Sequence, residues 1–316
     1  PNRVLSIDGH DKLSHFGFEI YGAIDAYSRY IVWCYVGISN RTAVSVNKQY
    51  LRLLRTTLHM PKLIHSDKGN FLNTISSIIL EIVLLAESHL TLWRANRPDL
   101  PFQKAYSYGK STKNQRIEAW WNILTEAQTQ EWKTYFAKLE LDGYFNGGET
   151  DKSCLQYLYM DLIRSHIYRF IEVHNSHPIR FQRNREHYLL TGQPFLMYYY
   201  PQSGKNYQEK VDEKVLEALE KKVENYNLDE YLPESIYLLY GRFLQEDGYP
   251  NIFAYSDPRH KDAYIYLRDR VSQYIADGGQ VHLASRPAGA AEWIAAEWIA
   301  VHKTHKIEIH RGSLIG

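Results

Sequence analysis

Apolar residues in the N-terminal part of the chain alternate in some stretches and follow helical spacing in others. Short alternating or β-branched runs predict strands at residues 4–7, 16–24, 30–36, 62–67 and 90–93. Helical spacing predicts helices at residues 41–59, 74–87 and 111–139, and residues 94–108 are expected to form a loop. This order of elements is typical of an α/β fold with a mixed sheet.

The pattern becomes mostly helical after residue 150. Amphipathic stretches predict helices at residues 155–173, 211–225 and 232–244, and within residues 257–283. We therefore expect an α/β core at residues 1–145 and a helical extension at residues 146–250. The pattern gives no role to the C-terminal region, residues 251–316, in which the pentapeptide AAEWI occurs twice in tandem.

Composition excludes several classes of protein. Hydrophobic residues make up 44% of the chain and charged residues 23%, which is close to globular averages and excludes wholesale disorder. No apolar run is long enough to cross a membrane as a helix. The two cysteines, Cys34 and Cys154, lie far apart, which excludes a disulfide framework and suits a reducing compartment.

Charge is distributed unevenly, although the formal net charge is only +1. Residues 1–120 contain 15 lysines and arginines against 9 aspartates and glutamates. A basic N-terminal part can bind a polyanion, but an ordinary solvated surface explains the charge equally well.

Three carboxylates stand out by their positions on the predicted elements. Asp8 ends the first strand, Asp67 ends the strand after the first helix, and Glu118 lies one to two turns into the long helix. Side chains at the ends of neighbouring strands can converge, and a helix packed across that edge can add a third. Converging carboxylates need a cation, and their oxygen atoms suit Mg²⁺ or Mn²⁺. Two such ions would activate a water or a 3′-hydroxyl and stabilise the leaving oxygen of a phosphodiester.

Two of these carboxylates, Asp8 and Glu118, have a structural alternative. Asp8 can cap a turn at the end of its strand, and Asp11 and Asp25 compete for its place in the site. Asp25 lies in the expected hairpin, where a short carboxylate commonly accepts hydrogen bonds from nearby backbone amides. Glu118 can be a solvated helix carboxylate.

Several polar residues are candidates for binding a nucleic acid. Asn114 lies one helical turn before Glu118 and can orient a substrate or support a ligand. Lys113 and Arg116 can contact phosphate, with plain solvation as the alternative. A basic cluster that can follow a nucleic-acid backbone consists of Arg180, Arg183 and Arg185.

Four segments, in order along the chain, carry a resemblance to a known family. They are SIDGHDKL at residues 6–13, GAIDAYSR at 22–29, HSDKGN at 65–70 and STKNQRIEAWW at 111–121. Together they resemble the integrase core domain of retroviral and transposon type, in particular the core-domain proteins of fungal and animal mobile elements. The last segment is the most specific, and its paired residues Trp120 and Trp121 are expected in the core. The interval from Asp67 to Glu118 is longer than in retroviral integrases, which predicts an insertion.

The resemblance implies a ribonuclease H-like α/β fold, with a mixed sheet flanked by helices and followed by a mostly helical C-terminal extension. It also implies a DDE-type integrase or transposase that cleaves DNA phosphodiesters and transfers strands. Asp8, Asp67 and Glu118 would then be the catalytic residues and the ligands of two Mg²⁺ or Mn²⁺ ions. The expected partner is DNA, the expected assembly is a homo-oligomer, and the expected location is the nucleus, with no membrane association. The alternative is a domesticated protein, derived from a mobile element, that binds nucleic acid or a partner without catalysis.

Overall fold

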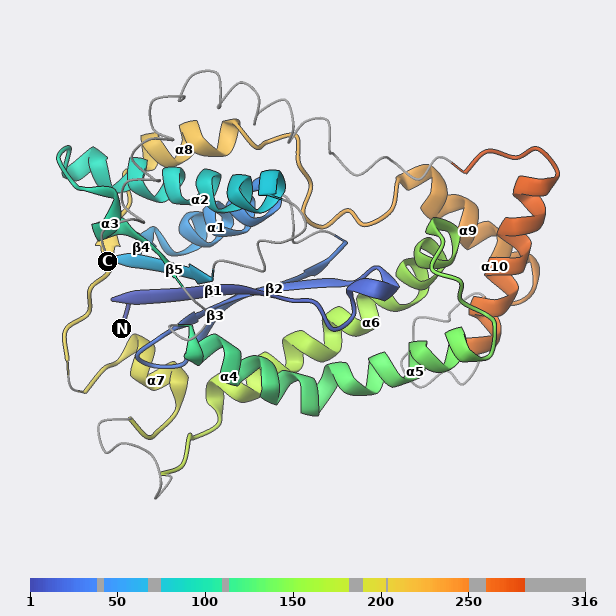
Figure 1. Ribbon diagram of the computed structural model, residues 1–316, viewed down its shortest axis with the longest axis horizontal. Coiled ribbons are helices and arrows are strands. Elements are labelled where there is room, and N and C mark those ends of the chain that lie inside the picture. Colours follow the sequence, from blue (N-terminus) through green and yellow to red (C-terminus); the bar gives the residue numbers. More distant parts are fainter. Residues whose placement is uncertain are drawn as a thin grey trace.

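The computed structural model describes residues 1–38, 43–67, 75–109, 114–181, 190–202, 204–249 and 260–281. Its centre is a five-stranded sheet with the strand order β3-β2-β1-β5-β6 (Figure 1). The strands are β1 (Val4–His10), β2 (Glu19–Asp25), β3 (Ile31–Gly37), β5 (Leu63–Asp67) and β6 (Tyr106–Gly109). β1, β2 and β3 form an antiparallel meander, whereas β5 lies parallel to both β1 and β6. The predicted mixed sheet is therefore confirmed.

Helices cover both faces of this sheet (Figure 1). One face carries α1 (Ala43–Thr57), α2 (Ile75–Asn96) and α8 (Glu213–Lys221), and the other carries α4 (Gln115–Leu124), α5 (Gln130–Leu141) and α6 (Glu149–Ser176). Leu5 and Ile7 of β1 are buried in the core beneath α1 and α2. Because side chains alternate along a strand, Asp8 and His10 belong to the face that α4 covers.

The long helix predicted at residues 111–139 is a continuous helical run with a change of pitch. α4 passes through a π-helical turn, Thr125–Thr129, into α5. The first residues of the predicted helix, 111–113, lie outside the described residues.

The helical extension is confirmed for the part of the chain that the structure describes. α6 packs along β3, and α7 (Pro194–Tyr199), α9 (Glu234–Glu246) and α10 (His260–Ala276) follow. Between α7 and α8 the chain returns to the first face, where β7 (Glu209–Lys210) pairs with β4 (His59–Met60). The domain boundaries stay predictions, and the tandem pentapeptide lies outside the described residues.

The predicted position of the last sheet strand is wrong. Residues 90–93 belong to α2, and the strand at the sheet edge is β6, which follows the short helix α3 (Phe102–Ala105) within the expected loop. The buried side chains of Leu85, His89 and Leu92 follow helical spacing. A run of four residues is too short to distinguish that spacing from a strand.

Candidate active site

The parallel strands β1 and β5 bring Asp8 and Asp67 to neighbouring positions. Their register ends with Ile7 opposite Ser66, so Asp8 and Asp67 are the next residues on the two strands. Neighbouring strands lie about 4.8 Å apart, so the two backbones are close at this point. The Asp67 side chain lies outside the described residues. Asp8 was predicted to end its strand, and this is wrong, because antiparallel pairing with β2 continues β1 to His10.

Helix α4 is fixed to β1 by two side chains on either side of Glu118. Asn114 donates from Nδ2 to the carbonyl oxygen of Ile7 at 3.1 Å, and Trp121 donates from Nε1 to Oδ2 of Asp8 at 3.0 Å. Asn114, Glu118 and Trp121 share one face of the helix because they are spaced four and three residues apart. Glu118 is half-buried and lies between these contacts. The helix face that carries Glu118 is therefore packed against the part of β1 that carries Asp8.

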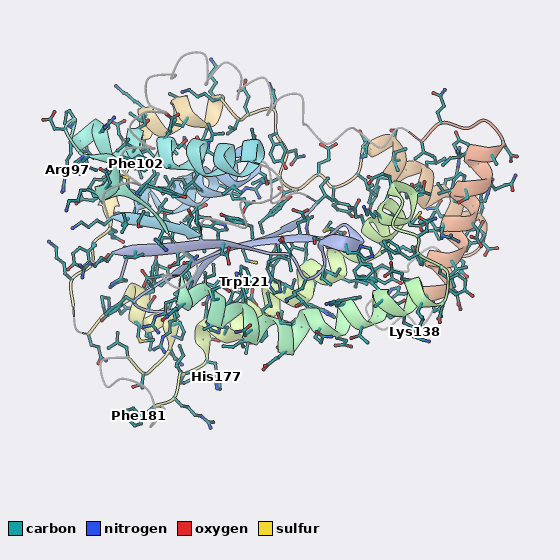
Figure 2. All side chains as sticks on the ribbon, viewed as in Figure 1. Arg97, Phe102, Trp121, Lys138, His177 and Phe181 are labelled. Atoms are coloured by element: carbon teal, nitrogen blue, oxygen red, sulfur yellow. The ribbon has the colours of Figure 1, made fainter. Side chains whose placement is uncertain are left out.

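Trp121 reaches Asp8 across space that Gly22 leaves open. Gly22 pairs with Asp8 in the antiparallel register of β1 and β2. A Cβ atom at Gly22 would lie 2.9 Å from Cη2 of the Trp121 indole, which is closer than packing allows. The indole lies between the sheet and α4 (Figure 2), and Trp121 is 4% exposed, as expected for a core residue.

His10 follows Asp8 by two residues on β1 and packs against the same indole. Its ring stacks on Trp121, with centroids 4.8 Å apart and planes inclined by 18°. Nε2 of His10 lies 3.3 Å from Oγ1 of both Thr125 and Thr129, at the two ends of the π-helical turn. The Thr125 hydroxyl donates to the carbonyl of Trp121, so Nε2 of His10 is the donor to Thr125. Burial lowers the pKa of His10 to about 4, so the ring is neutral at neutral pH.

The rival aspartates, Asp25 and Asp11, occupy different environments. Asp25 is 1% exposed, and its Oδ1 accepts hydrogen bonds from the backbone nitrogen and the hydroxyl of Ser28 at 2.8 and 2.7 Å. Its Oδ2 accepts from the backbone nitrogen of Asn2 at 2.7 Å. The hairpin role expected for Asp25 is therefore confirmed. Asp11 is exposed and follows the end of β1.

The predicted nucleic-acid contacts have different exposures. Arg180 is exposed beyond α6, and Arg116 is half-buried on α4. Asn114 is fully buried, and its amide nitrogen donates a hydrogen bond to the backbone of β1. It therefore does not face a surface at which a nucleic acid can bind. The remaining candidates, Lys113, Arg183 and Arg185, lie outside the described residues.

The donor set fits a hard divalent cation in its chemistry. Asp8, Asp67 and Glu118 offer carboxylate oxygens, which Mg²⁺ and Mn²⁺ prefer. Among the side chains that the structure describes, no three His, Cys, Asp or Glu residues gather closely enough to hold a metal ion. The Asp67 side chain is not among these described side chains. The fit thus rests on the register of β1 with β5 and on the placement of α4.

A mixed sheet in the order β3-β2-β1-β5-β6, with helices on both faces and a helical region after it, defines a ribonuclease H-like α/β core. A family model described as an integrase core domain matches residues 1–198, and the chain belongs to this family. The family suggests the polynucleotidyl transferase superfamily; its members generally depend on a divalent metal and bind DNA. A search of curated proteins found no match. Within the described ranges, no helix combines the length and apolarity needed to span a bilayer.

Proposed function

We propose that this chain is a DDE-type polynucleotidyl transferase that cleaves DNA phosphodiesters and transfers strands. Asp8, Asp67 and Glu118 would hold two Mg²⁺ or Mn²⁺ ions. The observation that supports this most directly is the pair of hydrogen bonds that fix α4 to Ile7 and Asp8 with Glu118 between them. A glutamate present only for solvation would lie on the outer face of this amphipathic helix.

The chemistry that such ions supply is activation of a water or a 3′-hydroxyl and stabilisation of the leaving 3′-oxygen. The side chains of the protein contribute charge and alignment. Asp8 and Glu118 contribute half-buried carboxylates, and the attachment of α4 to β1 through Asn114 and Trp121 would keep the strand and the helix aligned. Alignment of this kind is the main protein contribution to phosphoryl transfer.

DNA is the proposed substrate because members of the family generally bind it. Arg116 and Arg180 are the described basic residues that we propose for phosphate contacts, and Lys113, Arg183 and Arg185 stay predictions. A homo-oligomeric assembly and a nuclear location also stay predictions from the resemblance.

Glu118→Gln tests the proposal because it keeps the shape of the side chain and removes the negative charge that hard cations need. We expect nicking of supercoiled plasmid in Mg²⁺ to fall about 10³-fold, which corresponds to about 4 kcal/mol of transition-state stabilisation. The melting temperature should stay level or rise, because neighbouring carboxylates repel one another without metal. Glu126→Gln is the matched control, an exposed glutamate in the π-helical turn, and should change the rate less than about two-fold. Unchanged nicking by Glu118→Gln would refute the role of this helix.

A pre-cut DNA end separates cleavage from joining. If the wild type nicks plasmid but joins no pre-cut end, the chain is a nuclease of the same fold. If it binds DNA and neither nicks nor joins in Mg²⁺, the non-catalytic alternative holds.

A further inference from the structure

We propose that Trp121 is a positioning residue for Asp8, whose indole N–H sets the orientation in which that carboxylate meets a divalent cation. This inference rests on the proposed function of Asp8 as a metal ligand. The hydrogen bond from Nε1 of Trp121 to Oδ2 of Asp8 is 3.0 Å long, within the normal range for an N–H donor. A hydrogen bond to an ionised acceptor is stronger than one between neutral groups, so it can hold a carboxylate in one rotamer.

The indole itself has little freedom to turn. It is nearly fully buried, stacks on His10, and packs against Trp120 at a centroid distance of 4.6 Å. Gly22 lies so close that even a methyl group there would collide with the ring. The direction of the N–H group is therefore imposed by the core, and Asp8 conforms to it.

The neighbouring tryptophan shows that packing and hydrogen bonding are separable on this helix. Trp120 is as buried as Trp121, at 2% against 4% exposed, and both lie on α4. Nε1 of Trp120 has no hydrogen-bond partner among the described residues, whereas Nε1 of Trp121 donates to Asp8. If Trp121 served packing alone, an aromatic ring without a donor would serve as well.

Replacing a residue that holds a metal ligand in place commonly lowers metal affinity or activity about 10-fold to 100-fold. A carboxylate that loses one of its contacts must be ordered further when the cation binds, and the free energy of that ordering opposes binding. Loss of the Trp121 N–H should therefore weaken metal binding even when the protein stays folded.

Trp121→Phe removes the N–H group and keeps an aromatic ring. We expect the affinity for Mn²⁺, measured by calorimetric titration of the folded protein without DNA, to fall about 10-fold to 100-fold. Trp120→Phe removes an indole N–H that has no partner in the described chain, so its Mn²⁺ affinity should stay within about three-fold of the wild type. A purely structural role predicts lower melting temperatures for both variants and unchanged Mn²⁺ affinity for both.

A tryptophan analogue with sulfur in place of the indole N–H, 3-benzothienylalanine, covers the case in which Trp121→Phe does not fold. It keeps the size of the indole, and the same loss of Mn²⁺ affinity is expected. Asp8→Asn separates this inference from the proposed function. If Asp8→Asn does not weaken Mn²⁺ binding, the proposed function of Asp8 is wrong. If Asp8→Asn weakens binding and both Trp121 replacements leave it unchanged, only the inference about Trp121 is overturned.

Discussion

Asp8 and Asp25 are rivals for the same role in the sequence, and one conservative substitution at each position distinguishes them. Both oxygens of Asp25 accept hydrogen bonds in a buried site, from Ser28 on one side and from Asn2 on the other. Asparagine has only one acceptor oxygen. In Asp25→Asn, an NH₂ group must therefore face a donor, and at least one of these hydrogen bonds is lost.

The expected magnitudes follow from these contacts. A hydrogen bond to a charged group contributes about 1.5–3 kcal/mol, and a donor left without a partner in the interior adds to the loss. Asp25→Asn should therefore lower the free energy of unfolding by about 2–4 kcal/mol. Asp8 is half-buried, and an asparagine there can still accept from Trp121, so Asp8→Asn should change stability by less than about 1 kcal/mol.

Urea unfolding followed by circular dichroism, together with Mn²⁺ titration and plasmid nicking, completes the comparison. Below its melting temperature, Asp25→Asn should bind Mn²⁺ and nick DNA as the wild type does. Asp8→Asn should lose both properties while it remains stable. The opposite pattern, with Mn²⁺ binding lost only in Asp25→Asn, would refute the assignment and place Asp25 at the site.

Three further predictions follow from other contacts. Asn114→Ala removes the hydrogen bond to Ile7 and should cost about 1–2 kcal/mol in urea unfolding while Mn²⁺ still binds, so complete loss of Mn²⁺ binding would make Asn114 a ligand. Arg180→Ala should reduce the slope of log affinity for DNA against log salt concentration by about 1. Lys221→Ala, on the opposite face of the sheet, should leave that slope unchanged. Equal slopes for the two variants would exclude a phosphate contact by Arg180. Burial lowers the pKa of His89 to about 3 in the folded protein, whereas the unfolded chain binds this proton at about pH 6.5. Protonation below about pH 6.5 therefore favours the unfolded chain, and the free energy of unfolding falls towards acid pH. His89 alone should cost the wild type about 2 kcal/mol of unfolding free energy between about pH 8 and about pH 5; His89→Gln should lack this component, and identical pH profiles in urea unfolding would contradict its burial as a neutral group.

The fold was predictable where a local pattern determines the element. The three strands of the meander are short alternating runs separated by turn residues, and the structure has strands at each of them. β6 was not predictable in the same way, because its sequence, Tyr-Ser-Tyr-Gly, has no apolar run. Its place in the sheet depends on pairing with β5, which is distant in the sequence.

In the candidate site, the neighbouring strand positions of Asp8 and Asp67 were predictable from the sequence, whereas the contact that Trp121 makes with Asp8 was not. The register of β1 with β5 agrees with the expectation that Asp8 and Asp67 end up side by side. Trp121 was expected only as a core residue, because its contact with Asp8 joins positions 113 residues apart. Gly22 was the available signal, since a glycine inside a strand often marks the close approach of another group.

The helical run from α4 through the π-helical turn is attached to β1 at three levels. The contacts are those of Asn114 with Ile7, of Trp121 with Asp8, and of Thr125 and Thr129 with His10. Between the first and the third contact, the helical run advances about 16 Å from Asn114 to Thr125. The strand advances about 10 Å from Ile7 to His10. The helix therefore follows β1 along this part of the strand. Glu118 lies inside this attached stretch, and its backbone cannot shift without breaking a neighbouring contact. We therefore expect the positions of Asp8 and Glu118 to be established by the fold itself, before any cation binds.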